Sequence, residues 1–379
     1  MSLFEQLAAI VRNTFFESIR QPIVLVLLLI ATLSVILCNP LSAFTMEDDQ
    51  RMLVDLGLAT IFVSGTLLSA LVSTSVLTRE IDNKTALTVI AKPVGRPLFV
   101  LGKFLGVGGA MLVCTLYLAL VFMLVEMHTV QQTVRDPIHV PVILFGLGAA
   151  VLGLGAAVWC NYFYNRVFPS TTIVFITPLL ALAYVLTLMF GPDFSPQPIG
   201  SEFKPQLWLG VISVMLAVLV ITAVALALST RLGQAMTLAG TLAVFVLGML
   251  SNWMFGRQIA GLEQTWLDRA QAAGETEQRT ITQTIELVTG EQLESTREVV
   301  TAAQPLFTYG SLGEHLEYLL MRIGYSILPN FDSILITDAL TQEHVVPGSY
   351  VAKSFLYALA YIAAALSLAV VLFQRREVG

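Results

Sequence analysis

Charged residues are scarce in this chain: Asp, Glu, Lys and Arg together make up only 12% of its 379 residues. Soluble domains carry about 25%, so the composition excludes an ordinary water-soluble globular protein. Hydrophobic residues reach 56%, and the mean hydropathy is +0.79. The sequence therefore predicts an all-α, polytopic membrane helix bundle.

Clusters of basic residues and of metal ligands are also lacking. The net charge is −6, and binding to a nucleic-acid backbone needs clustered Lys and Arg, so no nucleic-acid partner is expected. The three cysteines form no CxxC or Cys/His spacing, which predicts neither a zinc site nor a disulfide framework. Because Cys38, Cys114 and Cys160 fall in or beside apolar stretches, we expect them to pack as small hydrophobic side chains.

Catalytic signatures are missing as well. The chain has no G-x-x-x-x-G-K-[ST], H-E-x-x-H, G-x-S-x-G or dinucleotide-binding motif. We therefore expect neither an enzyme nor a cofactor or metal site in this chain. The four histidines are predicted to lie singly in outer loops, without the clustering that metal ligation requires: His128, His139, His315 and His344.

Apolar runs long enough to cross a bilayer, roughly 17–25 residues, recur along the chain. Residues 1–20 are instead amphipathic and predict a helix lying in the membrane interface; the alternative is a cytoplasmic extension of the first span. We expect no cleavable signal peptide, because no small-residue cleavage site follows the first apolar run. The predicted spans are near 22–39, 54–77, 101–125, 140–163, 169–190, 208–229, 235–255 and 350–373.

The orientation follows from the loops, because short cytoplasmic loops are enriched in Lys and Arg. Basic residues precede the first span, lie between the second and third, and follow the last. The alternate loops are acidic or poor in basic residues. This pattern places both termini in the cytoplasm and requires an even number of spans. Eight spans fit; the alternative is six, with 140–190 partly re-entrant.

Residues 256–349 form the one sizeable polar segment, between residues 1–255 and the last span with its tail, 350–379. The segment has thirteen acidic residues, five Arg and no Lys, which predicts an extracytoplasmic location. Its central part, 266–300, fits either helices or a strand, and we expect it to be too polar to bury a core of its own. The more apolar stretch 316–336 predicts a half-embedded helix pair at the outer surface.

A short charged loop between the second and third spans combines an acidic pair with paired turn signals. Glu80 and Asp82 favour the start of a short helix over 83–90, and Lys92–Pro93 would end it. An ordinary cytoplasmic loop explains the basic residues but neither the acidic pair nor the turn residues. Related features lie elsewhere: Ala227–Arg231, Leu328–Pro329–Asn330–Phe331 and Phe373–Gln374–Arg375–Arg376–Glu377.

Together these features resemble the transmembrane permease subunits of type-2 ABC exporters. The resemblance implies a subunit of an ATP-driven exporter of the bacterial inner membrane, acting as a homodimer or with a similar permease. A separate ABC ATPase would bind ATP and Mg and would dock on the loop. The implied coupling residues are Glu80, Asp82, Lys84, Thr85, Lys92, Pro93 and Arg96.

The chain departs from that family, whose members usually have six spans and a short outer helical hairpin. Two other functions remain open from the sequence: a membrane scaffold that holds a partner on 256–349, and a secondary transporter. The near absence of ionisable residues inside the spans disfavours the second.

Small and hydroxylated residues supply the remaining features of the spans. We interpret the glycines as helix-packing seams rather than hinges. Hydroxyl groups either line a polar groove or bond to carbonyls of their own helices. These glycines are Gly102, Gly106, Gly108, Gly109, Gly146, Gly148, Gly153 and Gly155, and the hydroxyl-bearing residues are Ser64, Thr66, Ser69, Ser73, Thr74, Ser75, Thr115 and Tyr117.

Overall fold

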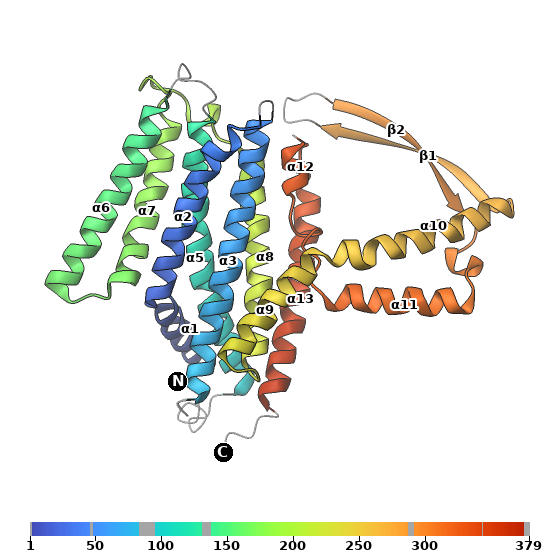
Figure 1. The fold of residues 1–379 in the computed structure, drawn as a ribbon, viewed down its shortest axis with the longest axis horizontal. Coiled ribbons are helices and arrows are strands. Elements are labelled where there is room, and N and C mark those ends of the chain that lie inside the picture. The colour runs from blue at the N-terminus through green and yellow to red at the C-terminus, as the bar shows by residue number, and fades with distance from the viewer. Residues whose placement is uncertain are drawn as a thin grey trace.

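A computed structural model describes residues 2–45, 48–82, 95–130, 138–286, 292–342 and 344–374; the side chains of 77–82 and 279–299 fall outside that description. The structure is a long helix bundle from which a smaller arm projects sideways (Figure 1). The helices are α1 (Leu3–Ile19), α2 (Pro22–Ser42), α3 (Asp49–Asp82), α5 (Arg96–His128), α6 (Val140–Tyr164), α7 (Phe168–Leu188), α8 (Pro205–Ser229), α9 (Gln234–Met249), α10 (Arg257–Ala272), α11 (Leu312–Ile327), α12 (Thr337–Thr341) and α13 (Gly348–Gln374), with strands β1 (Thr276–Glu286) and β2 (Gln292–Ala302).

Proline marks where several of the long helices begin. Pro occupies the first or second position of α2, α5, α6, α7 and α8. Its fixed φ suits the first turn of a helix, where its missing N–H costs no hydrogen bond. The first helix starts differently, with a capping box in which Ser2 and Glu5 exchange hydrogen bonds. Local sequence therefore sets most helix starts.

In the described residues, seven helices are long and apolar enough to cross a membrane, and an eighth span results if a bent helix pair counts as one. The chain is therefore a membrane-embedded helix bundle, as predicted. The bent pair consists of α9 and the helix over Asn252–Ala272, which begins with a π-helical turn over Asn252–Gly256 and continues as α10. The two helices are bent by 46° at the break between them. Helix α9 and the turn together cover 234–256, close to the predicted seventh span. The total of eight remains a prediction.

The hairpin formed by α6 and α7 occupies the region for which a re-entrant segment was the alternative. Both helices are long and apolar enough to span, and they pack against each other. Asn165 ends α6 with a left-handed backbone (φ 53°), and α7 starts three residues later. Gly153 lies directly against Ile176 of α7, as expected for a packing seam. Two full helices in this region argue against the six-span alternative.

Three helices form the centre of the bundle. The most buried spans are α3, α5 and α8, whereas α2, α6 and α13 are the least buried. On the central helices, hydroxyl groups bond within the protein: Ser69 of α3 lies 2.9 Å from Thr222 of α8, and Thr74 donates to the carbonyl of Ala70. These hydroxyl-bearing residues of α3 are buried in the bundle and do not line a groove.

The arm corrects several sequence predictions. It contains a two-stranded antiparallel sheet, with Thr276 opposite Ala302 and Glu286 opposite Gln292, so the fold is not purely α-helical. The predicted boundary between residues 255 and 256 lies within the π-helical turn and stays a prediction. The stretch 316–336 contributes one long helix, α11, and not a helix pair. In Figure 1 the hairpin, α10 and α11 extend away from the bundle beyond α13.

The arm also buries a small core of its own, contrary to expectation. Trp266 of α10 is 1% exposed and is surrounded by the rings of Phe307, His315 and Tyr318, with centroids 5.3–5.5 Å away. Its indole N–H donates to Glu314 at 3.1 Å. The aromatic residues that make this core lie on both sides of the hairpin in sequence, which is why composition alone did not reveal it.

Candidate functional site

The predicted coupling residues flank the gap between α3 and α5. Glu80 and Asp82 lie in the last turn of α3, where the helix dipole disfavours negative charge. Arg96 is the first residue of α5, so it belongs to a helix and not to the loop. The predicted helix over 83–90 lies outside the described residues, as do Lys84, Thr85, Lys92 and Pro93.

Arg96 is joined to the end of the last helix. Its Nη1 donates to the carbonyl oxygen of Gln374 at 2.9 Å, and one turn along α5 the ring of Phe99 stacks on Phe373 at 5.8 Å. From the turn between α8 and α9, Arg231 Nε donates to the carbonyl of Leu372, also at 2.9 Å. Three segments that the sequence singled out separately thus meet at one end of the bundle. Both termini lie at this end (Figure 1), which we call the N/C end.

The first helix packs along α5 at the same end. A Cβ atom at Gly102 would lie 2.6 Å from Ile10, and one at Gly106 would lie 2.5 Å from Thr14. The two glycines therefore form a packing seam for α1, as predicted. The helix itself is confirmed, and its position in the membrane interface remains a prediction.

Lys103 is buried beside this seam, which the sequence did not indicate. Its side chain is 2% exposed, lies 3.6 Å from Glu17 of α1, and sits over the ring of Phe99 at 5.7 Å. Lys103 lies in the second turn of α5. The ion pair thus connects α1 and α5 at the end of the bundle where the arginine contacts also lie, and the cation–π contact lies within α5.

A second ionic contact lies at the opposite end of the bundle, which we call the far end. Glu126 in the last turns of α5 is 3% exposed. It accepts a hydrogen bond from Gln50 of α3 at 2.7 Å and one from Lys204, just before α8, at 2.5 Å. Since these partners are 76 and 78 positions away in sequence, sequence patterns gave no signal for this cluster.

The distance between these two buried charges can be compared with the thickness of the hydrocarbon layer of a membrane. A helix rises about 1.5 Å per residue, so Lys103 and Glu126 are about 35 Å apart along α5. The hydrocarbon layer is about 30 Å thick, and both charges therefore lie at or beyond its edges. The buried charged side chains in the described part of the chain are these two and Asp49, at the start of α3. None of them is at mid-depth.

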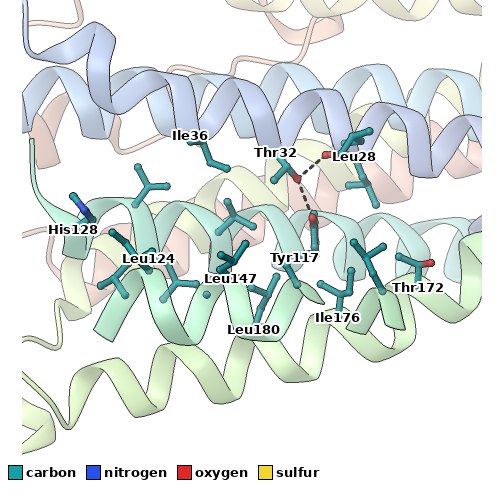
Figure 2. Close-up of a pocket in the computed structure, with 18 of the residues that line it drawn as sticks. Leu28, Thr32, Ile36, Tyr117, Leu124, His128, Leu147, Thr172, Ile176 and Leu180 are labelled. Carbon is teal, nitrogen blue, oxygen red and sulfur yellow. Dashed lines mark hydrogen bonds between the residues drawn. The ribbon is translucent and has the colours of Figure 1, made fainter. Parts of the chain in front are cut away.

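A long apolar groove opens on one side of the bundle. It has a volume of about 590 Å³ and is lined by α2, α5, α6 and α7 (Figure 2). Helix α2 packs on α3 and α5, whereas α6 packs on α7. The groove lies between α2 and α6, and residues of α5 and α7 line its base. No Asp, Glu, Lys or Arg is among its described lining residues.

One hydrogen-bonded pair lies partway along the groove. Thr32 donates to the carbonyl of Leu28 at 2.7 Å, and its hydroxyl lies 2.9 Å from the hydroxyl of Tyr117 (Figure 2). Because Thr32 has a single hydroxyl proton, Tyr117 is the donor of the second bond. The sequence proposed Thr115 and Tyr117 for a polar groove; Tyr117 lines this apolar one, whereas Thr115 is buried inside the bundle.

The histidines also differ from the prediction of single residues in outer loops. His128 ends α5 and lines the groove at its far end, His139 is 7% exposed, and His315 of α11 stacks on Phe307 at 4.5 Å. Throughout the described ranges, no group of three or more His, Cys, Asp or Glu side chains is placed to hold a metal ion. Cys38 and Cys114 are buried as expected, and Cys160 is partly exposed.

In comparisons with known proteins, no family model, no curated protein and no solved structure matches this chain.

Proposed function

We propose that this chain is the transmembrane permease subunit of an ATP-driven ABC exporter. A separate ABC ATPase binds ATP and Mg, and the permease couples its closure to movement of substrate across the membrane. The observation that carries the proposal is the contact of Arg96 with the end of α13. Through it, the segment that follows α3 is mechanically joined to the last helix of the bundle.

The contacts at the N/C end suit the transmission of force. A displacement of the segment between α3 and α5 moves Arg96 and Phe99, which hold the end of α13. It also moves the glycine seam and Lys103, which hold α1. Rigid helices then carry the displacement to the far end, where Glu126 ties α5 to α3 and to the start of α8. One displacement of this segment thereby moves five helices together: α1, α3, α5, α8 and α13.

The proposal includes an orientation and a location. The segment between α3 and α5, on which the ATPase would dock, is called the docking segment. This segment and both termini face the cytoplasm of a bacterium. The chain lies in the inner membrane, and two permease copies work together. The arm is then extracytoplasmic. Its helix α11 has an exposed aliphatic stripe typical of a helix that rests on a lipid surface: Leu312, Leu316, Leu319, Leu320, Ile323 and Ile327.

The arm itself favours the second candidate, a membrane scaffold. It is held by an internal core and by a bidentate ion pair in which Arg269 contacts Glu314 at 2.7 and 2.8 Å. A stable projection of this kind suits the holding of a partner protein. A secondary transporter is disfavoured, because the buried charges of the described chain lie at the two ends of the bundle and coupling needs an ionisable group inside the membrane.

Reconstitution with and without an ATPase separates these candidates. The purified chain alone is expected not to hydrolyse ATP. Co-expression with a P-loop ATPase encoded in a neighbouring reading frame is expected to give a stable complex whose hydrolysis exceeds that of the ATPase alone. A chain that hydrolyses ATP by itself, or a neighbouring ATPase that neither binds nor responds, contradicts the proposal.

A further inference from the structure

The groove between α2 and α6 faces the lipid side of the bundle. These two helices are among the least buried spans, and their rims toward the groove are aliphatic and exposed, as at Leu29 and Leu147. In a bilayer such a groove is in contact with acyl chains. If it were left empty, its walls would lose dispersion contacts on one side, so a hydrocarbon chain is the occupant that the surroundings supply.

The chemistry of the walls selects the same occupant. The polar pair within the groove is satisfied internally, since Tyr117 donates to Thr32 and Thr32 donates to Leu28. This part of the groove therefore requires no polar ligand, and a charged ligand would meet no counter-charge among the described lining residues. The volume of about 590 Å³ falls within the range of small-molecule sites.

The two ends of the groove differ, which gives the occupant a direction. Asn39 and His128 lie together at the far end, where the Asn39 amide donates to the carbonyl of Thr129 at 2.8 Å. Toward the N/C end the lining continues to Leu25, and the distance from there to Pro40 along α2 is about 22 Å at about 1.5 Å per residue. The groove is thus long and apolar along its body, with an amide and an imidazole side chain at the far end. At the other end the hydroxyl of Thr172 is satisfied internally, because it donates to the carbonyl of Phe168.

We propose that this groove binds an acyl chain of a bilayer phospholipid, with the head group beside Asn39 and His128. The site is formed by α2 and α5 together with the α6–α7 hairpin. It does not depend on the coupling function proposed above. A second copy of the chain inserting a helix between α2 and α6 is the competing occupant.

Photo-crosslinking of the full-length protein tests the proposal. The chain is placed in nanodiscs that contain phosphatidylethanolamine with a diazirine on one acyl chain, irradiated, and digested for peptide mapping. Labelling is expected to be several-fold higher on groove peptides from α2 and α6 than on α13, whose exposed Phe355 and Leu359 face the surroundings without a groove. Equal labelling of the groove and of α13 overturns the proposal.

Two variants fill the groove and one serves as a matched control. Gly146 and Ala150 both line the groove, so Gly146→Leu and Ala150→Leu are each expected to reduce groove labelling several-fold. Gly148→Leu adds the same side chain on the same helix, where the glycine has open space and does not line the groove, and is expected to leave labelling unchanged. If Gly146→Leu does not fold, Ala150→Leu still tests whether filling the groove reduces labelling.

Two results contradict the proposal. Equal labelling in the filling variants and in Gly148→Leu shows that the acyl chain does not enter the groove. Disulfide crosslinks between copies carrying cysteine at Leu29 and Leu147 show instead that a second copy occupies it.

Discussion

Arg96 and Gln374 are 278 positions apart in sequence, yet the guanidinium of the first donates to the backbone carbonyl of the second at 2.9 Å. The contact joins the first residue of α5 to the last residue of α13. It places the predicted docking segment and the C-terminal helix at one end of the bundle. Arg231 contacts the same end of α13 but does not adjoin the docking segment. Substitution of Arg231 is therefore a control for substitution of Arg96.

Substitution of Gly106 tests the packing of α1 on α5. A Cβ atom there would lie 2.5 Å from Thr14 Cβ and 2.9 Å from the carbonyl oxygen of Val11, so Gly106→Ala forces the helices apart. Overpacking of this kind costs about 1–3 kcal/mol, and we expect a lower unfolding temperature in a thermal shift assay. Gly155→Ala is the control, because nothing lies within 4 Å of that position. Equal stability of the two variants contradicts the seam.

Loss of Lys204 tests the ionic cluster at the far end. In Lys204→Ala the buried carboxylate of Glu126 loses the hydrogen bond from Lys204 and keeps the one from Gln50. Hydrogen bonds to charged groups contribute about 1.5–3 kcal/mol, so the unfolding temperature is expected to fall by several degrees. Asp48→Asn breaks the exposed contact with Arg51 and is expected to have almost no effect. A similar loss in both variants refutes a special role for Glu126.

Acid is expected to loosen the arm through Glu314. The Arg269 guanidinium, the backbone of Ser311 and the Trp266 indole hold the pKa of Glu314 well below its usual range. A depressed pKa in the folded state gives stability that is present above the unfolded value, about 4.3, and is lost as the pH falls below it. The protection factors of α10 and α11 against hydrogen exchange, which are corrected for the intrinsic effect of pH on the exchange rate, should therefore stay constant from pH 7 to about pH 5 and fall at lower pH.

The matched variants for this prediction are Glu314→Gln and Glu317→Gln. The first is expected to give faster exchange in the arm and a weaker dependence on pH. The second removes an exposed carboxylate from the same helix and should behave like the wild type. If Glu314→Gln keeps the acid response of the wild type, another group is responsible.

Single-cysteine labelling in intact cells tests the orientation. Cysteines at Glu275 and Thr341 are expected to react with an impermeant reagent from outside, and cysteines at Lys84 and Gln374 only after permeabilisation. Expression of each variant at the wild-type level is the control for insertion. Labelling at Glu275 only after permeabilisation overturns the extracytoplasmic position of the arm.

The sequence predicted those features that depend on local patterns. Long apolar runs identified the spans, because a bilayer requires about the same length of apolar helix each time. The hydropathy of 140–190 identified the α6–α7 pair, and the spacing of Gly102 and Gly106 indicated a seam. The clusters around Glu126 and Trp266 were missed, because their partners come from distant segments and no local pattern marks them.

Other features needed contacts that no single local pattern specifies. Nothing local marked Lys103 as buried, because its partner Glu17 comes from another helix. In the arm, the sequence left both helices and a strand open for 266–300, and the pairing of β1 with β2 decides for strands. The groove arises from the separation of α2 and α6, which no sequence pattern encodes.

Co-purification of the neighbouring P-loop ATPase with wild-type and substituted chains tests the central claim most directly. We predict that the ATPase purifies with the wild type and with Arg231→Ala, which loses a contact to α13 but leaves the docking segment intact. Glu80→Ala and Arg96→Ala should insert normally and lose much of the complex and of the stimulated hydrolysis. Full complex and full activity in both of these variants would contradict the account.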